Sequence, residues 1–439
     1  MNRKERFRDI FLRGTIWSAI FKGTNLGFSF LISIVLARLA GPTEYGIYIY
    51  ALSICGILGI PAVFGFGGLL VREISSYQSQ MKWQLMRGLI IFTNTFSVAF
   101  SMVIALFAIT VVWFWEDKWT LQEAITLSIA LVLLPLNTIK QIWGATLIGL
   151  QRILLSQLFS GVIQNFIFLF LVAIIYIFSL KKIDAPIAME MQLMAAFFSV
   201  MMMWFFLNKS YPKSVKSSTA IFETQRWIKN TTPFLLINGM QILYMQTDIL
   251  MIGMFKEMND VGLYHVATRG AMIVTLVYMA VNIPLAPTIA RLFSQGELAK
   301  LQRIITLVTR ATVLATLPLV LILLFFGSTL IVFIFGDKFL GAWDAFAILV
   351  SAQFIYLLMG PRETLLSMTA YANYTVIGLT ITTFLNILLN YFLIPIWGIT
   401  GAATATAISG IVGNIFLVYW AIGLSKINPT IFTTLKNIR

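Results

Sequence analysis

The chain has 439 residues, of which 59% are hydrophobic and 11% are charged. A soluble domain carries about 25% charged residues, so this composition excludes a protein whose whole surface faces water and predicts an integral membrane protein. The formal net charge of +14 comes from basic residues in many separate segments rather than one patch, which argues against a nucleic-acid partner.

Twelve apolar runs are long enough to cross a membrane as helices, each of which needs about 20 residues. In chain order they are 15–38, 44–70, 85–114, 121–149, 153–179, 187–207, 231–254, 263–288, 304–334, 341–360, 374–394 and 399–422. The runs are continuous rather than alternating, which favours helices over a β-barrel. We therefore predict an all-α integral membrane protein with about 12 transmembrane helices.

The basic residues predict the orientation of these spans. With the N-terminus inside, 22 of the 31 Lys and Arg residues fall in cytoplasmic segments and five fall in outer loops. By the positive-inside rule, both termini are expected in the cytoplasm. The longest loop contains KSYPKSVKSST and joins the sixth and seventh spans. We therefore predict a six-helix lobe over 1–207, a cytoplasmic linker over 208–230 and a second six-helix lobe over 231–439.

A short motif occurs at the same place in both predicted lobes. Residues 39–53 read LAGPTEYGIYIYALS, and 216 residues later 255–269 reads FKEMNDVGLYHVATR. At matching positions both contain an acidic residue, Gly, an aliphatic residue, Tyr and Ala. The pattern indicates an internal duplication. Because six spans is an even number, the two copies would be related by a pseudo-twofold axis along the membrane normal, as in transporters that work by alternating access.

Ionisable side chains within spans are candidate functional residues, because charges at membrane depth are costly. The candidate substrate-binding residues of a cationic cavity are Lys22, Asn25, Arg38, Lys140 and Arg269. Asp248 is the candidate ion-coupling residue. Basic residues outnumber this acid, so an anionic, phosphate-containing ligand is expected.

Structural roles for some of these residues stay open. Lys22 and Arg38 would also suit a position near the membrane surface, where long basic side chains reach the interface. Asp248 would also suit a pair with a basic neighbour that fixes helix packing. Asn386 and Asn390 are spaced i, i+4 and are expected to hydrogen-bond across helices.

Sequence motifs for catalysis are missing. The chain contains no GxxxxGK[ST] phosphate-binding loop, no DxD and no HExxH cluster, and its predicted outer loops are short. A membrane-embedded glycosyltransferase or polymerase is therefore the weakest alternative. We expect no enzyme activity and no cofactor, with coupling to H⁺ or Na⁺ as the exception to be tested.

Three stretches resemble the polysaccharide transporter family, the O-antigen-type flippases. They are VLARLAGPTEYGIYIYALS, QTDILMIGMFKEMNDVGLYHVATRG and LNILLNYFLIPIWGITGAATATAIS. The resemblance covers nearly the whole chain and extends to the superfamily that contains multidrug extruders and the lipid II flippase. It implies two six-helix lobes with a cationic cavity between spans one, two, seven and eight. It also implies that Arg269 belongs to the substrate-binding set of that cavity.

The same resemblance implies a function. The expected substrate is an undecaprenyl-pyrophosphate-linked oligosaccharide, such as an O-antigen unit of lipopolysaccharide. It would pass from the inner to the outer leaflet of a bacterial inner membrane. A monomer is expected, with membrane lipids as its surroundings and a polysaccharide polymerase and ligase as candidate partners. A cation-coupled multidrug exporter of the same fold is the main alternative.

Overall fold

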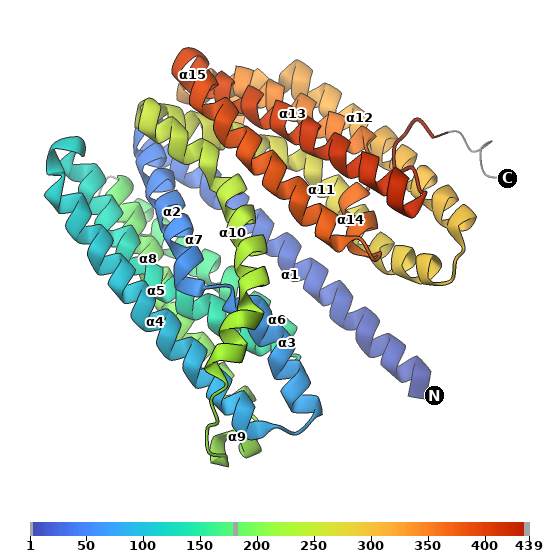
Figure 1. The fold of residues 1–439 in the computed structure, drawn as a ribbon. Coiled ribbons are helices and arrows are strands. Elements are labelled where there is room, and N and C mark those ends of the chain that lie inside the picture. Colours follow the sequence, from blue (N-terminus) through green and yellow to red (C-terminus); the bar gives the residue numbers. More distant parts are fainter. Residues whose placement is uncertain (1–2, 179–182, 434–439) are drawn as a thin grey trace. The chain divides into compact units, whose positions relative to one another are not determined.

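A computed structural model describes residues 3–178 and 183–433, and in these ranges the chain is built from helices and their connections (Figure 1). The longer helices are α1 (Arg3–Ala40), α2 (Pro42–Val63), α3 (Phe66–Ser79), α4 (Trp83–Phe114), α5 (Leu121–Gly149), α7 (Ile163–Ile177), α8 (Ala185–Ser210), α10 (Thr224–Phe255), α11 (Met258–Ser294), α12 (Leu298–Phe335), α13 (Trp343–Leu358) and α15 (Ala372–Ser425). Short elements connect them, namely η1 (Glu116–Lys118), α6 (Ile153–Gln157), η2 (Leu158–Val162), α9 (Lys213–Ser217), η3 (Asp337–Ala342) and α14 (Arg362–Ser367). The predicted cytoplasmic location of the two termini concerns residues 1–2 and 434–439 as well, and these lie outside the described residues.

Eleven helical segments of the described chain are long and apolar enough to cross a membrane. The difference from the twelve predicted spans lies in α15, a helix of 54 residues that covers the last two of them. Gly398 interrupts α15 with φ 58° and ψ −132°, a backbone conformation that belongs to no helix. The two halves of α15 pack together, since Asn386 Nδ2 donates to Thr406 Oγ1 at 3.1 Å. The helix therefore doubles back and supplies two crossings, as the apolar runs predict.

The predicted second span, 44–70, is too long at its C-terminal end. The structure ends α2 at Val63 and starts α3 at Phe66. Between them Phe64 and Gly65 both have positive φ, 50° and 72°. A Cβ on Gly65 would lie 2.5 Å from the backbone nitrogen of Leu235, so this turn needs glycine for space as well as for conformation. Hydropathy misses the break because both flanks are apolar.

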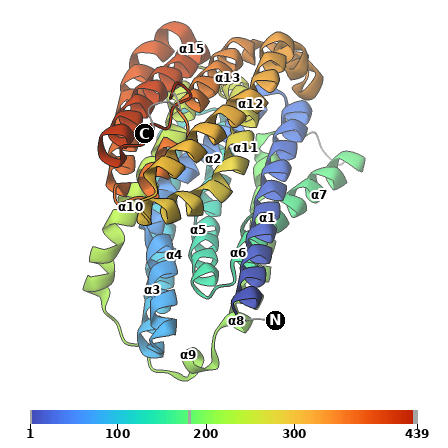
Figure 2. The same cartoon turned by 90° about the vertical axis from the view of Figure 1, so that its right-hand side faces the viewer.

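The chain folds into two compact units. Unit 1 comprises Met1–Ala40 and Ile47–Ile242, and unit 2 comprises Gly41–Gly46 and Leu243–Arg439. In unit 1, α3, α4 and α5 lie side by side (Figures 1 and 2) around a core that includes Phe66, Leu70 and Trp227. In unit 2, α11, α12, α13 and α15 pack together.

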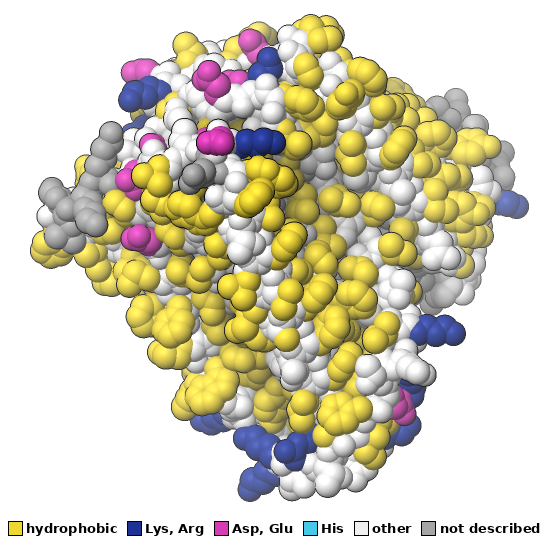
Figure 3. Space-filling model, turned by 60° about the vertical axis from the view of Figure 1, so that its left-hand side comes forward, with side chains coloured by type: hydrophobic (Ala, Val, Ile, Leu, Met, Phe, Trp, Pro, Cys, Tyr) yellow, Lys and Arg dark blue, Asp and Glu magenta, His cyan; other side chains and the backbone are white. Residues whose placement is uncertain are grey.

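Hydrophobic side chains dominate the surface as well as the cores. On the face drawn in Figure 3 they cover most of the area, and charged side chains gather in separate places. Large apolar residues are widely exposed, among them Phe114 at 82% and Phe325 at 77%. Exposed apolar area on this scale is stable only in contact with lipid, so the chain is a multi-pass membrane protein.

The duplicated motif forms one tight contact inside unit 2. Gly41 (φ 84°) ends α1, and Pro42 opens α2 at a first-turn position that suits proline. A Cβ on Gly46 would overlap the carbonyl oxygen of Met258, and one on Gly262 would overlap that of Pro42. The two matching glycines therefore let the first turns of α2 and α11 touch backbone to backbone, which explains why both copies carry Gly.

Replacing Gly262 with alanine is expected to destabilise the protein. The added methyl group meets backbone rather than a movable side chain, and overpacking of this kind costs about 1–3 kcal/mol. Thermal unfolding of the purified protein in detergent measures the effect. Gly27→Ala is the matched control, because nothing lies within 4 Å of its added Cβ. Equal unfolding temperatures for the two variants would contradict the proposed contact.

Candidate functional site

The carboxylate of Asp248 on α10 lies in a buried polar cluster of unit 2, where its residue is 8% exposed. One carboxylate oxygen accepts from Asn386 Nδ2 at 3.1 Å and Asn390 Nδ2 at 2.7 Å. The other accepts from the hydroxyls of Tyr264 at 2.5 Å and Thr406 at 2.6 Å. Two α15 amides and hydroxyls from α11 and α15 thus stabilise the buried charge, in agreement with the predicted cross-helix bonding of the two asparagines.

This cluster also contains oxygen atoms that suit a small cation. Asn390 Oδ1 is buried without a hydrogen-bond partner, and Asp248 makes no salt bridge within the described chain. Rotation of either amide would add its oxygen to the carboxylate and the two hydroxyls. An all-oxygen set is the type that hard cations prefer, and one carboxylate balances one monovalent cation or one proton.

A second hydrogen-bonded network in unit 2 contains Arg269. Its Nε donates to His265 Nε2 at 3.2 Å, and His265 Nδ1 lies 2.7 Å from the hydroxyl of Tyr45. Because Nε2 accepts, a neutral His265 carries its hydrogen on Nδ1 and donates to Tyr45. Tyr45 and His265 are 1% and 6% exposed, whereas Arg269 is only partly buried and makes no salt bridge within the described chain. The arrangement fixes a guanidinium group while leaving hydrogen-bond donors for an anion.

In unit 1 the structure brings Lys140 and Asn25 to neighbouring positions of α7. Lys140 Nζ donates to Asn137 Oδ1 at 3.1 Å and to Gln164 Oε1. Asn165 Nδ2, one residue further along α7, donates to Asn25 Oδ1 at 2.9 Å. The π-helical turn η2 comes directly before α7, and such turns are frequent at functional sites.

Two predicted substrate residues lie on the exposed surface of α1. Lys22 and Arg38 both have exposed side chains on α1. Sequence reasoning missed Tyr45, Tyr264 and Gln164 as site residues, because neutral polar side chains give no charge signal within a span. The Tyr pair of the duplicated motif contained a clue, since Tyr264 is one of its matching positions.

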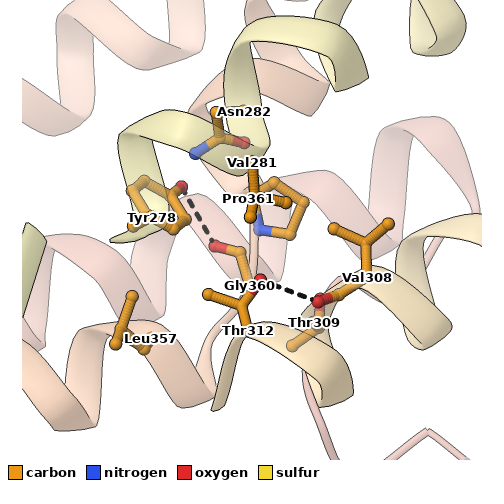
Figure 4. A pocket seen from close by; sticks show the side chains of 9 residues that line it. All are labelled: Tyr278, Val281, Asn282, Val308, Thr309, Thr312, Leu357, Gly360 and Pro361. Atoms are coloured by element: carbon orange, nitrogen blue, oxygen red, sulfur yellow. Dashed lines mark hydrogen bonds between the residues drawn. The ribbon is translucent and has the colours of Figure 1, made fainter. Parts of the chain in front are cut away.

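A small cavity in unit 2 is lined by residues that belong to neither cluster (Figure 4). Tyr278, Thr309 and Thr312 are among its lining residues, and the Tyr278 hydroxyl donates to Gly360 O at 3.5 Å. Its volume of about 10 Å³ is at most that of a single water site. It is therefore too small to hold a transported substrate.

Comparison with known proteins gives a family match over most of the chain. Residues 35–344 match the family described as polysaccharide biosynthesis protein. The uncharacterized membrane protein MJ1068 of Methanocaldococcus jannaschii is 21% identical over 94% of this chain and 84% of its own length. The probable flippase AglR of Haloferax volcanii is 33% identical, over 42% of this chain and 39% of its own. A second H. volcanii protein, the probable low-salt glycan biosynthesis flippase Agl15, is 26% identical over 44% and 41%.

Solved structures share the fold at low sequence identity. A multidrug resistance MATE transporter in an inward-facing conformation has a TM-score of 0.72 and 13% identity, over 92% of this chain and 94% of its own. The lipid II flippase MurJ in an inward closed conformation has a TM-score of 0.71 and 15% identity, over 92% and 87%. Both support the two-lobe fold of about 12 membrane helices. The family match covers more than half of the chain, and the chain belongs to the family described as polysaccharide biosynthesis protein.

Proposed function

We propose that the chain is a flippase that moves an isoprenoid-pyrophosphate-linked oligosaccharide across the membrane by alternating access. The observation that carries the proposal is Arg269, a guanidinium held within a span by His265 and Tyr45 without an acidic partner in the described chain. Guanidinium groups bind phosphate oxygens with paired hydrogen bonds, so the pyrophosphate is the natural ligand. Similarity to the probable flippase AglR supports a flippase activity, and similarity to the probable low-salt glycan biosynthesis flippase Agl15 supports a glycan-containing substrate.

We further propose that Asp248 couples this movement to a cation. Its cluster provides one buried negative charge, and the free oxygen of Asn390 lies in the same cluster. Binding of Na⁺ or H⁺ would neutralise the carboxylate and weaken its bonds to α11 and α15. A change of charge at a point shared by three helices would shift the balance between two conformations.

The finer identity of substrate and membrane is part of the proposal. An undecaprenyl carrier, an O-antigen glycan and a bacterial inner membrane fit the sequence motifs, whereas the curated relatives are archaeal. Lys22, Asn25 and Arg38 on α1 are the proposed additional substrate contacts. A lipid-linked glycan carries both charge and many hydroxyl groups, so basic and amide side chains would each have partners on it.

Reconstitution with a labelled substrate tests the proposal. The purified protein in liposomes is given a fluorescent undecaprenyl-pyrophosphate oligosaccharide, and movement between leaflets is followed by quenching from one side. Arg269→Ala is expected to reduce the rate about tenfold, the equivalent of about 1.4 kcal/mol, because it removes the phosphate contact. Arg303→Ala, an exposed arginine in the same unit, is the control and should retain the wild-type rate.

The alternative function is tested in the same liposomes. A multidrug exporter would move organic cations and leave the lipid-linked glycan in place. Movement of ethidium without movement of the glycan would overturn the proposal. Equal rates of glycan movement by wild type and Arg269→Ala would remove Arg269 from the mechanism.

A further inference from the structure

A pocket of about 420 Å³ opens on unit 1, and none of its lining residues is a candidate substrate or coupling residue. It lies between α4, α5 and the end of α8, and none of its lining residues is acidic. Its lining includes apolar residues (Val98, Ile139 and Leu207) and polar residues (Asn94, Thr95, Asn208 and Tyr211). The pocket therefore suits an amphipathic ligand with a polar end and an apolar end.

The α5 and α8 residues of the pocket lie near the ends of their helices, at the level of a membrane interface, whereas its α4 residues lie deeper, 11 to 15 residues from the start of α4. Its α8 residues belong to the last two turns of that helix, and Tyr211 follows the helix directly. Trp143 is six residues before the end of α5, or about 9 Å at helical rise. Trp143, Trp204 and Tyr211 form an aromatic group at this level. Aromatic side chains of this kind concentrate where lipid headgroups meet acyl chains.

Two polar groups of the pocket have no partner. Asn208 and Tyr211 form no side-chain hydrogen bond within the described chain, although both line the pocket. Trp143 differs, since its Nε1 donates to Asn94 Oδ1 at 2.8 Å and the Asn94 amide donates to Ile90 O at 2.7 Å. Burial raises the pKa of Tyr211 above its ordinary value, so its hydroxyl stays protonated and available as a donor.

Basic residues border Asn208 and Tyr211 along the chain. Lys209 follows Asn208 and is exposed, and Lys213 comes two residues after Tyr211 at the start of α9. Arg87 of α4 donates to Lys216 O at 2.8 Å and also to Ser218 O. These bonds tie α9 to the base of α4. The segment that carries the lysines is thus fixed on the same unit, and it favours an anionic group.

We propose that this pocket binds one anionic phospholipid of the adjacent leaflet. Asn208 and Tyr211 would donate to the phosphate, and Lys209 and Lys213 would balance its charge. The glycerol and one acyl chain would lie against Trp204 and the apolar lining residues. The site is independent of the proposed transport function, because it is confined to unit 1 and uses none of the candidate substrate or coupling residues.

Lipid retention by the purified full-length protein tests this site. Native mass spectrometry is performed after exchange into detergent with phosphatidylglycerol or phosphatidylcholine at equal concentration. One phosphatidylglycerol per protein should be retained in preference to phosphatidylcholine. The double variant Asn208→Leu/Tyr211→Phe should reduce this retention about tenfold. Tyr419→Phe, which changes a tyrosine that is 71% exposed in unit 2, should leave it unchanged.

A second variant covers the case in which the pocket variant fails to fold. Lys209→Gln/Lys213→Gln changes surface charges only and should weaken retention about fivefold for each lysine. Equal retention of the two phospholipids, or retention unchanged in both double variants, would overturn the proposal and leave ordinary boundary lipid. Inorganic phosphate at roughly tenfold excess over the lipid is the last check. If it displaces the lipid, the pocket is a free-phosphate site, and the phospholipid proposal is overturned.

Discussion

Replacing Asp248 with asparagine is expected to abolish cation-driven glycan movement while the protein stays folded. The side chain keeps its shape, but the cluster loses the only charge that a cation would balance there. Four donors surround the carboxylate, and an amide cannot accept from all of them. The free energy of unfolding should therefore fall by about 1–3 kcal/mol, and transport under a Na⁺ or H⁺ gradient should fall more than about tenfold.

The control for this variant retains the carboxylate. Thr316→Val on α12 removes a buried hydroxyl outside the cluster, which donates to Thr312 O at 2.7 Å. It should lower stability by at most about 1 kcal/mol, while transport stays responsive to the gradient. Liposomes prepared with a Na⁺ gradient, a H⁺ gradient or neither identify the coupling ion. Wild-type rates for Asp248→Asn under every gradient would show that the cluster only fixes the packing of α10, α11 and α15.

Much of the fold follows from the continuity of the apolar runs. The predicted span 121–149 coincides with α5, because polar residues end the run on both sides. The last two spans are also right, although Gly398 joins them with so short a break that one helix of 54 residues covers both. The end of the second span is wrong, since the turn at Phe64 and Gly65 depends on space beside Leu235 rather than on hydropathy.

The candidate site was predictable only where a charge marked it. Asp248 stands out as an acid within a span, and the i, i+4 spacing of Asn386 and Asn390 indicates their shared face. Tyr264 and Thr406 complete the cluster from other helices, with no local pattern that marks them as partners. Pairing between such distant positions is decided by how helices pack, which hydropathy does not encode.

A charge that is counted for the orientation can also have a packing role. Arg362 contributes to the count of basic residues that predicts the orientation, yet it is 5% exposed. Its guanidinium donates to Asn414 Oδ1 at 2.6 Å, Tyr356 O at 2.8 Å and Gly360 O at 2.9 Å. A buried arginine with three acceptors stabilises the connection before α14. Its charge therefore bears on packing in unit 2 as well as on topology.

Lys140→Met is expected to destabilise unit 1 and to reduce glycan movement through that loss. Methionine fills a similar volume but leaves the oxygens of Asn137 and Gln164 without their donor. Gln164 is 4% exposed, so water does not readily replace the ammonium group. An unsatisfied buried acceptor costs about 1–3 kcal/mol, which corresponds to an unfolding temperature lower by several degrees.

The double variant Lys140→Met/Gln164→Leu decides between two roles for this lysine. Removing both partners of a buried polar pair is often close to neutral, so the double variant should regain most of the lost stability. If Lys140 acts by holding α5 to α7, the rate of glycan movement should return to within about twofold of the wild-type rate. A twofold difference in rate corresponds to less than about 1 kcal/mol. Recovery of the unfolding temperature without recovery of transport would instead make Lys140 a substrate contact. Its ammonium would then have to leave Gln164 during the transport cycle, and the network seen here would be the resting state of a mobile charge.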